Sequence, residues 1–559
     1  MAENLNKRLR RIFESRSSAS EPRAYQNVRN LYQSCMETDA INNSSISEVM
    51  VIIQELGGWP VLEGDGWEGR DFKWLDMAIR AWQKGFDFEG LIDIKIEIDS
   101  KDATKRILEI NQPNLGLSRE YLVKGLEDKD VKAYLKYMTD MSLLLGAPED
   151  VARKDMKDVL DLEIEVAKIC LAKEERRNKT ALYNPIAVKD ISTLYALPWM
   201  KHLNSIVTIE ENELVNVAVP SYLRNLDTLL ANTPVRTIAN LLMWRHVQFS
   251  VDFLAEEAAE IKLDFNKILH GTGTEFPRWE ICVKKTAGID QANEYSDYYF
   301  YKAEGSLTNA VGAMYAKEHF PPSSKQLIDE IVENIRDEFR LILQELDWMD
   351  EETRARALKK ADLITPHIAY SKEILDDELL DEYYKGFVLN GTSYLANILQ
   401  LKKRIFAYYV TEFRKPIDKQ SWKTHGGAAI ANAFYSAEEN SMVFPAGILD
   451  GVFFKADRPL YMNYGGIGVV VGHEITHGFD DEGSQKDADG SLVDWWEPET
   501  KKHYLEKTQC VIDQYSNYTV QVGDEMLHVN GINTQGENVA DIGGVKEALR
   551  TYIKLVERY

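Results

Sequence analysis

One short segment constrains the fold and the chemistry of this chain more than any other. It reads Val-Val-Val-Gly-His-Glu-Ile-Thr-His-Gly-Phe-Asp-Asp over residues 469–481. His473 and His477 are four residues apart, so on an α-helix they lie one turn apart on the same face. Two imidazoles at this spacing can bind one Zn²⁺, with zinc–nitrogen bonds of about 2.0–2.1 Å. Glu474 follows the first histidine, and the pattern H-E-x-x-H predicts that it acts as a general base on water.

The alternative is a surface helix that carries these residues by chance. The three valines that open the segment are apolar, so the helix is expected to emerge from a hydrophobic core. Buried histidine and glutamate side chains need polar partners or a metal. The sequence therefore favours a zinc site.

A zinc hydrolase needs a third protein ligand and an open position for water. In a metzincin, Gly and His would stand three and six places after the second histidine, but Asp480 and Gly483 occupy those positions. The remaining source is a glutamate on a later helix. Glu537 and Asp541 are four residues apart, so Glu537 can bind the metal while Asp541 accepts the free N–H of a ligand histidine. Asp480 is a second candidate for such a supporting contact.

Several further stretches, together with the zinc helix, carry a family resemblance. The chain resembles the neprilysin and endothelin-converting-enzyme family of zinc metallopeptidases over essentially all 559 residues. The clearest matches outside the zinc helix are 432–435 (Asn-Ala-Phe-Tyr), 443–449 (Val-Phe-Pro-Ala-Gly-Ile-Leu), 463–468 (Asn-Tyr-Gly-Gly-Ile-Gly), 492–496 (Leu-Val-Asp-Trp-Trp) and 531–534 (Gly-Ile-Asn-Thr) leading into Glu537.

The hydrophobic pattern between residues 21 and 415 is mostly helical. Segments 151–175, 221–263 and 324–347 carry apolar residues at three- and four-residue spacing. Residues 91–98 alternate apolar and charged side chains and predict a strand. The resemblance implies a mainly α fold with two helical lobes around a central cavity, and a thermolysin-like catalytic lobe with a small β-sheet.

Two domains are therefore expected. Residues 1–404 would form a mostly helical body and lid, with some segments packing into the catalytic lobe. Residues 405–559 would form the zinc peptidase lobe.

The resemblance also implies a substrate groove. Residues 428–435 are expected to form a strand whose free edge pairs with the substrate backbone, with Asn432 and Ala433 at the contact. An apolar pocket would receive the side chain after the scissile bond, which implies cleavage of short peptides on the amino side of large hydrophobic residues. The residues that match this pocket are Ile448, Phe453, Val469 and Val470.

The expected site thus holds one Zn²⁺ on His473, His477 and Glu537, with Glu474 and Asp541 in catalytic support. Family members continue past the position of Tyr559, with a histidine that stabilises the oxyanion and an arginine that holds the substrate. His503 and His528 are the nearest substitutes, and both are expected on exposed elements. Two alternatives remain open: an active endopeptidase, or a truncated peptide-binding or decoy form with weak or no turnover.

Charge and hydropathy limit the partners. The net charge of −24 argues against nucleic acid or an anionic membrane surface as a partner. No apolar run approaches the length of a membrane span, and residues 1–11 are polar and basic rather than a signal peptide. Family members are commonly membrane-anchored or secreted, so we expect the chain to begin inside an extracellular or cell-surface ectodomain.

Cysteines and glycosylation sequons fit that expectation. By resemblance, Cys35 and Cys282 form a disulfide, whereas Cys510 is expected to be unpaired. Cys170 lies in a helical pattern and is expected to be a buried thiol. Five N-x-[ST] sequons occur, at Asn42, Asn43, Asn178, Asn390 and Asn517.

Overall fold

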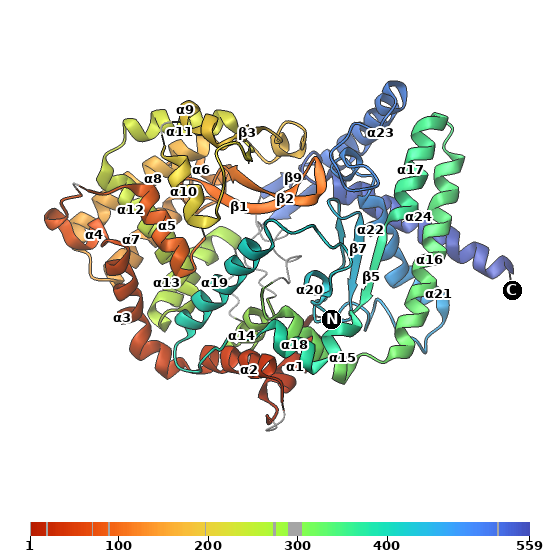
Figure 1. Cartoon of the computed structure of the whole chain (residues 1–559), viewed down its shortest axis with the longest axis horizontal. Helices are drawn as coiled ribbons and strands as arrows, with labels where there is room; N and C mark the ends of the chain where they lie inside the picture. Colours follow the sequence, from red (N-terminus) through yellow and green to blue (C-terminus); the bar gives the residue numbers. More distant parts are fainter. Residues whose placement is uncertain are drawn as a thin grey trace.

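The computed structural model describes residues 2–17, 21–69, 71–87, 90–195, 197–271, 276–288, 305–522 and 525–558. The chain is mainly α-helical and forms two lobes, as the family resemblance implies (Figure 1). Helices α3–α13 gather in one lobe, and α16, α17 and α21–α24 gather in the other. The zinc-helix segment therefore lies in the second lobe.

The first lobe and the base shared by both lobes contain helices from the first half of the chain. Their bounds are α1 Ala2–Glu14, α2 Arg23–Met36, α3 Thr38–Leu56, α4 Pro60–Glu63, η1 Gly64–Gly66, α5 Trp74–Lys84, α6 Arg119–Leu122, α7 Lys129–Leu144, α8 Glu149–Ile169, η2 Glu174–Arg177, α9 Val188–Leu194, α10 Trp199–Ile206, α11 Pro220–Ala231, α12 Val235–Ser250, η3 Val251–Phe253, α13 Glu256–His270, α14 Arg278–Ala287 and α15 Thr308–His319.

The remaining helices follow in chain order. They are α16 Pro322–Glu345, α17 Glu351–Leu363, η4 Lys372–Leu375, α18 Asp377–Tyr383, α19 Tyr394–Glu412, α20 Trp422–His425, α21 Leu460–Asn463, the π-helical turn η5 Tyr464–Gly468, α22 Val469–His477, η6 Gly483–Gln485, α23 Pro498–Ser516 and α24 Gln535–Arg558.

Small sheets accompany the helices. In the first lobe the strand order is β1–β2–β4–β3, with bounds β1 Asp93–Asp99, β2 Asp102–Asn111, β3 Pro185–Ala187 and β4 Leu214–Val217. In the second lobe the order is β5–β7–β6, with bounds β5 Thr365–Ala369, β6 Phe434–Ser436 and β7 Ser441–Pro445. Strands β8 Thr519–Val522 and β9 Glu525–His528 form a hairpin. The alternating segment 91–98 thus largely becomes β1.

Two local expectations differ from the structure. The helical segment 221–263 is divided into α11, α12 and α13. Pro234, which disfavours a helical backbone at the residue before it, accounts for the first break, and the second falls at η3 and the extended Leu254. The strand expected over 428–435 is confined to β6, and residues 428–433 are irregular. That stretch instead lies against Gly447, where a Cβ would come within 2.4 Å of the Ile430 carbonyl oxygen.

Buried apolar side chains form one continuous cluster that extends through both lobes. Cys35 and Cys282 are joined by a disulfide that ties α2 to α14. Cys170 is buried and unpaired, and Cys510 is exposed and unpaired. No helix in the described part of the chain combines the length and apolar character that crossing a membrane requires.

Candidate metal centre

The zinc-helix segment is held by its apolar face. Val471 and Ile475 of α22 are fully buried, whereas His473 and His477 lie on the partly exposed face. The histidine pair therefore faces outward from the core while its helix is anchored in it.

Helix α24 packs along α22 at very short range, and glycines allow this approach. A Cβ at Gly544 would lie 2.5 Å from the Val469 carbonyl oxygen and 2.7 Å from the His473 nitrogen. A Cβ at Gly472 would lie 2.8 Å from the Gly544 Cα. No larger residue fits without moving a backbone, so the glycines set the distance between the two helices.

Three side chains converge where these helices meet. Glu537 Oε2 lies 3.3 Å from His473 Nε2 and 3.5 Å from His477 Nε2, and the two Nε2 atoms are 2.9 Å apart. A tetrahedral zinc ion with bonds of about 2.0–2.2 Å separates its ligand atoms by about 3.3–3.6 Å. The two separations from Glu537 to the histidines match one ion, whereas the two Nε2 atoms would have to move apart by a few tenths of an ångström to bind it. Within the described ranges, no other group of His, Cys, Asp and Glu side chains converges in this way.

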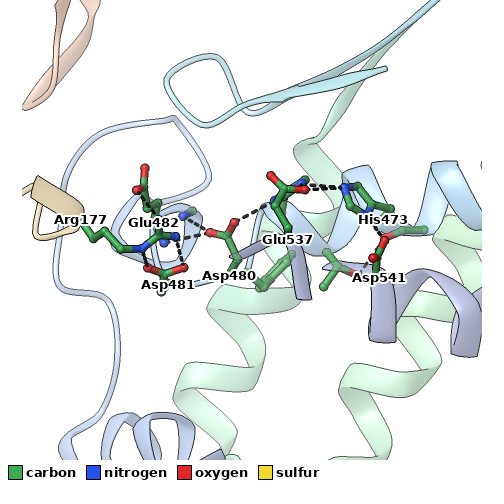
Figure 2. A network of polar contacts seen from close by, with 12 residues as sticks. Arg177, His473, Asp480, Asp481, Glu482, Glu537 and Asp541 are labelled. Carbon is green, nitrogen blue, oxygen red and sulfur yellow. Dashed lines mark hydrogen bonds and ion pairs between the residues drawn. The ribbon is translucent and has the colours of Figure 1, made fainter. Parts of the chain in front are cut away.

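Each histidine is oriented by a carboxylate on its other nitrogen. His473 Nδ1 donates to Asp541 Oδ1 at 2.9 Å (Figure 2). His477 Nδ1 donates to Asp480 Oδ2 at 2.8 Å. Because an ionised carboxylate only accepts, both Nδ1 atoms carry a proton, and a metal would bind at the Nε2 atoms in place of any second proton there. Asp480 is itself fixed by the backbone N–H groups of Glu482 and Gly483.

The charged side chains of the site shift one another's pKa values. Burial raises the pKa of Glu474 to about 7, against the opposing effect of the two histidines. Hydrogen bonds from His473 and His477 hold the pKa of Glu537 well below its usual range. Burial lowers the pKa of His477, but its contacts with Asp480 and Glu537 outweigh that effect and raise it to about 11. The carboxylates thus favour positive charge at this point, as a bound cation requires.

The converging residues open onto a cavity of about 690 Å³. Its lining residues come from both lobes and include Ile96, Ile98 and Arg106 of the first sheet and residues 432–439, which contain β6. Glu474 also lines it, although the side chain is almost completely buried. The cavity is therefore a cleft between the lobes with the three candidate ligands and a candidate base in its wall.

The structure places the other predicted residues in two groups. Asn432 and Ala433 line the cavity and immediately precede β6, which is an edge strand of its sheet. Ile448, Phe453, Val469 and Val470 are not among its lining residues. Ile448 is buried in the core, and Phe453 and Val470 pack against the core. His503 and His528 also lie outside the cavity, on α23 and β9.

Arg177 and His425 line the cavity and were not predicted from the sequence. Arg177 stands in the run Glu-Glu-Arg-Arg, which reads as a solvated charged turn. His425 is a lone histidine in a short helix. Neither residue carries a spacing signal, because each reaches the site only through tertiary packing.

Comparison with known proteins gives a consistent result. Two models described as peptidase family M13 match residues 1–371 and 432–558. Neprilysin-2 of Drosophila melanogaster is 39% identical over 566 residues, covering 100% of this chain and 72% of the relative. Human neprilysin is 33% identical over 558 residues, covering 96% and 72%.

Solved structures show the same fold. An inhibitor complex of a zinc metalloprotease from Mycobacterium tuberculosis superposes with a TM-score of 0.84 at 24% identity, covering 100% of this chain and 80% of that one. The PepO protein of Lactobacillus rhamnosis gives a TM-score of 0.80 at 20% identity, covering 98% and 81%.

Proposed function

The chain belongs to peptidase family M13, whose members are zinc metalloendopeptidases, and on that premise we propose that it cleaves short peptides on the amino side of large hydrophobic residues. The observation that carries the proposal is the convergence of His473, His477 and Glu537 beside the buried Glu474, inside a cavity between two lobes. One zinc ion is the proposed cofactor.

The proposed roles follow from the contacts. His473, His477 and Glu537 hold the ion, and Asp541 and Asp480 fix the histidine tautomers. Zinc, when bound, polarises the scissile carbonyl and makes water more acidic. Glu474 accepts the proton from the attacking water and passes it to the leaving amine.

The substrate is proposed to enter as an extended strand. Strand β6 is an edge strand, so its free side can pair with a peptide backbone beside Asn432 and Ala433. Enclosure by both lobes favours short peptides over folded proteins. We assign Ile448, Phe453, Val469 and Val470 to the apolar subsite on the family resemblance alone, because they do not line the cavity in this structure.

The two-part division remains part of the proposal. The proposed body is residues 1–404 and the proposed catalytic lobe is residues 405–559, although this boundary falls within α19. Helices α22 and α24 both lie in the second lobe. Strand β5 pairs with β7 although it precedes residue 404, and α16 packs on α24. These contacts support the expectation that segments of the body pack into the catalytic lobe.

An extracellular or cell-surface location is proposed as well. The Cys35–Cys282 disulfide supports it, because disulfides persist mainly in oxidising compartments. The sequon asparagines at 42, 43, 178, 390 and 517 are all exposed. Expression through a secretory pathway should give a glycosidase-sensitive mass, and a product without glycan and with both cysteines reduced would contradict this location.

The substrate preference can be tested with blocked peptides that differ in one residue. Matched ten-residue peptides carry Phe, Leu, Ala or Asp at one central position, and mass spectrometry locates the cut. We expect cleavage before Phe and Leu, weak cleavage before Ala and none before Asp, with all cleavage lost in Glu537→Ala. Cleavage at the same rate whatever residue stands at the varied position would contradict the proposed specificity but not the proposed zinc centre.

A further inference from the structure

Arg177 of the first lobe contacts residues that lie directly beside the metal centre. Arg177, at the end of η2, donates from Nε to Asp481 Oδ2 at 2.5 Å and from Nη2 to Asp481 Oδ1 at 2.8 Å. Its Nη1 donates to the Asn533 carbonyl oxygen at 3.2 Å. The Arg177 and Asp481 side chains are only 21% and 14% exposed, so this two-bond pair is protected from water.

Its two partners belong to the two segments that supply the zinc ligands. Asp481 follows Asp480, the residue that orients His477. Asn533 lies just before α24, whose first turn carries Glu537. One guanidinium therefore connects the end of the histidine helix with the start of the glutamate helix. Figure 2 shows Arg177 on one side of Asp481, with Asp480 and Glu537 on the other.

The side chains around Gly536 are packed too closely to admit a larger residue unless they move. A Cβ on Gly536 would lie 3.0 Å from Asp480 Oδ2, 3.1 Å from Arg177 Nη2 and 3.2 Å from Asp481 Oδ1. The backbone beside Glu537 thus rests directly on the arginine–aspartate pair. A shift of Arg177 is expected to move the glutamate ligand and the partner of His477 together.

Electrostatics reinforce the connection. Asp480, Asp481 and Glu482 form three consecutive carboxylates next to the metal centre. Burial raises the pKa of Asp481, and hydrogen bonds from Arg177 oppose that rise. Lys179 Nζ contacts Glu482 Oε2 at 2.8 Å. Removing Arg177 would leave Asp481 buried beside two like charges, which would push the Asp480 loop away from His477.

Neighbouring contacts fix the segment that carries Arg177. The Gln485 side chain donates to the Arg177 carbonyl oxygen at 2.8 Å and accepts from the Lys179 N–H at 2.9 Å. Glu174 accepts from the Asn530 and Asn533 side chains at 2.8 and 3.0 Å. The guanidinium is therefore held in place before any ligand binds.

We propose that Arg177 is a positioning residue that couples docking of the first lobe to the arrangement of the zinc ligands. It holds the Asp480–Asp481 loop against the start of α24, so that His477 and Glu537 face one ion. Its proposed action on the metal centre runs through its contacts with Asp481 and Asn533.

The inference rests on the proposed zinc centre, and its test measures zinc affinity rather than turnover. The metal-free wild-type, Arg177→Gln and Arg177→Lys proteins each compete with a chromophoric chelator for zinc. The matched control is Arg414→Gln, which removes an exposed two-bond pair with Glu213, and neither residue of that pair lines the cavity. We expect a zinc dissociation constant about 10–100-fold higher in Arg177→Gln, a smaller rise in Arg177→Lys, and no change in the control.

Two results would overturn the proposal. The first is a folded Arg177→Gln protein whose zinc affinity lies within twofold of wild type. A purely structural role of Arg177 would give this unchanged zinc affinity together with a lower melting temperature. If Arg177→Gln does not fold, unchanged zinc affinity in Arg177→Lys is decisive in its place. Failure of wild type to bind zinc would instead reject the proposed function itself.

A double-mutant cycle tests the route. If Arg177 acts through the Asp480 loop, Asp480→Asn and Arg177→Gln together should weaken zinc binding much less than the product of their separate effects. A simple product of the two fold-changes would show that Arg177 does not act through this loop.

Discussion

At the residue scale, Glu474 is the side chain with the most direct proposed role. It is only 5% exposed, yet it lines the cavity beside the two histidines. Burial favours its neutral form and raises its pKa to about 7, so the carboxyl can both accept and return a proton near neutral pH. A residue that first acts as a general base and then as a general acid needs a pKa close to the working pH.

We therefore predict that Glu474→Gln binds zinc normally and loses peptide cleavage by about 10²–10⁴-fold, the usual contribution of a positioned base. Turnover of a quenched peptide and zinc content per chain are the two readouts. Glu412→Gln is the matched control, because Glu412 lines the same cavity from α19 and has no proposed role. Cleavage by Glu474→Gln at the wild-type rate would remove Glu474 from the mechanism.

The residues of the site differ in how far the sequence predicts them. The spacing of His473 and His477 fixes their common face, because a helix repeats every 3.6 residues. The contribution of Glu537 depended on pairing two distant motifs and on the family resemblance. Arg177 lies 304 positions before its partner Asp481, and no local pattern marks it. A charged turn in the sequence gives no sign of which distant carboxylate it will meet.

At the scale of elements, the metal centre depends on the contact between α22 and α24. Gly472, Gly543 and Gly544 allow the two backbones to meet. The separation of these helices decides whether Glu537 and Asp541 reach the histidines. The sequence shows these glycines, but only the packed structure shows why a side chain is excluded there.

We predict that Gly544→Ala separates the helices, because its Cβ would lie 2.5 Å from the Val469 carbonyl oxygen. Overpacking of this kind typically costs about 1–3 kcal/mol in the free energy of unfolding. Zinc affinity should fall by about tenfold or more, as the contact from Asp541 to His473 is lengthened.

Gly465→Ala is the matched control for this prediction, since a Cβ there meets nothing within 4 Å. Chemical denaturation and zinc competition should leave this variant close to wild type. Equal behaviour of the two alanine variants would show that helix separation does not set the metal site.

The predicted strand over 428–435 shows the opposite limit of sequence analysis. Only Phe434 and Tyr435 of that range are paired. Residues 428–433 are mostly alanine, which is depleted in strands, so their strand propensity is low. The Gly447 N–H donates to the Ala428 carbonyl oxygen at 2.9 Å, so this irregular stretch is held by a tertiary contact rather than by strand pairing.

At the scale of the whole molecule, one continuous core joins both lobes, and it buries histidines that are not part of the metal centre. His246 of α12 packs against Phe86, with ring centroids 4.9 Å apart. Burial lowers its pKa from 6.5 to about 3. The unfolded chain therefore binds a proton near pH 6.5 that the folded chain does not bind.

This shift predicts acid lability with a defined sign. The contribution of His246 to stability is present above pH 6.5 and is lost as the pH falls towards 3. Between pH 7 and pH 5 the loss is about 2 kcal/mol, from 1.36 kcal/mol per pKa unit. Urea denaturation measures the free energy of unfolding at both pH values. Its fall from pH 7 to pH 5 should be smaller in His246→Leu than in wild type by this amount.

Phe86→Leu supplies the control for the acid-lability prediction, because it removes packing on the same ring without removing a titrating group. It should lower stability equally at pH 7 and pH 5. A wild-type and a His246→Leu protein with the same pH dependence would contradict the assignment of acid lability to this histidine.

The central claim is that one zinc ion at the junction of the two lobes drives peptide cleavage. The most direct measurement strips the metal with a chelator, removes the chelator, and follows cleavage of a quenched peptide with Phe after the scissile bond during zinc titration. We predict no cleavage by the stripped protein and full recovery at one zinc per chain. Cleavage that survives stripping, or one bound zinc per folded chain with no cleavage, would contradict it.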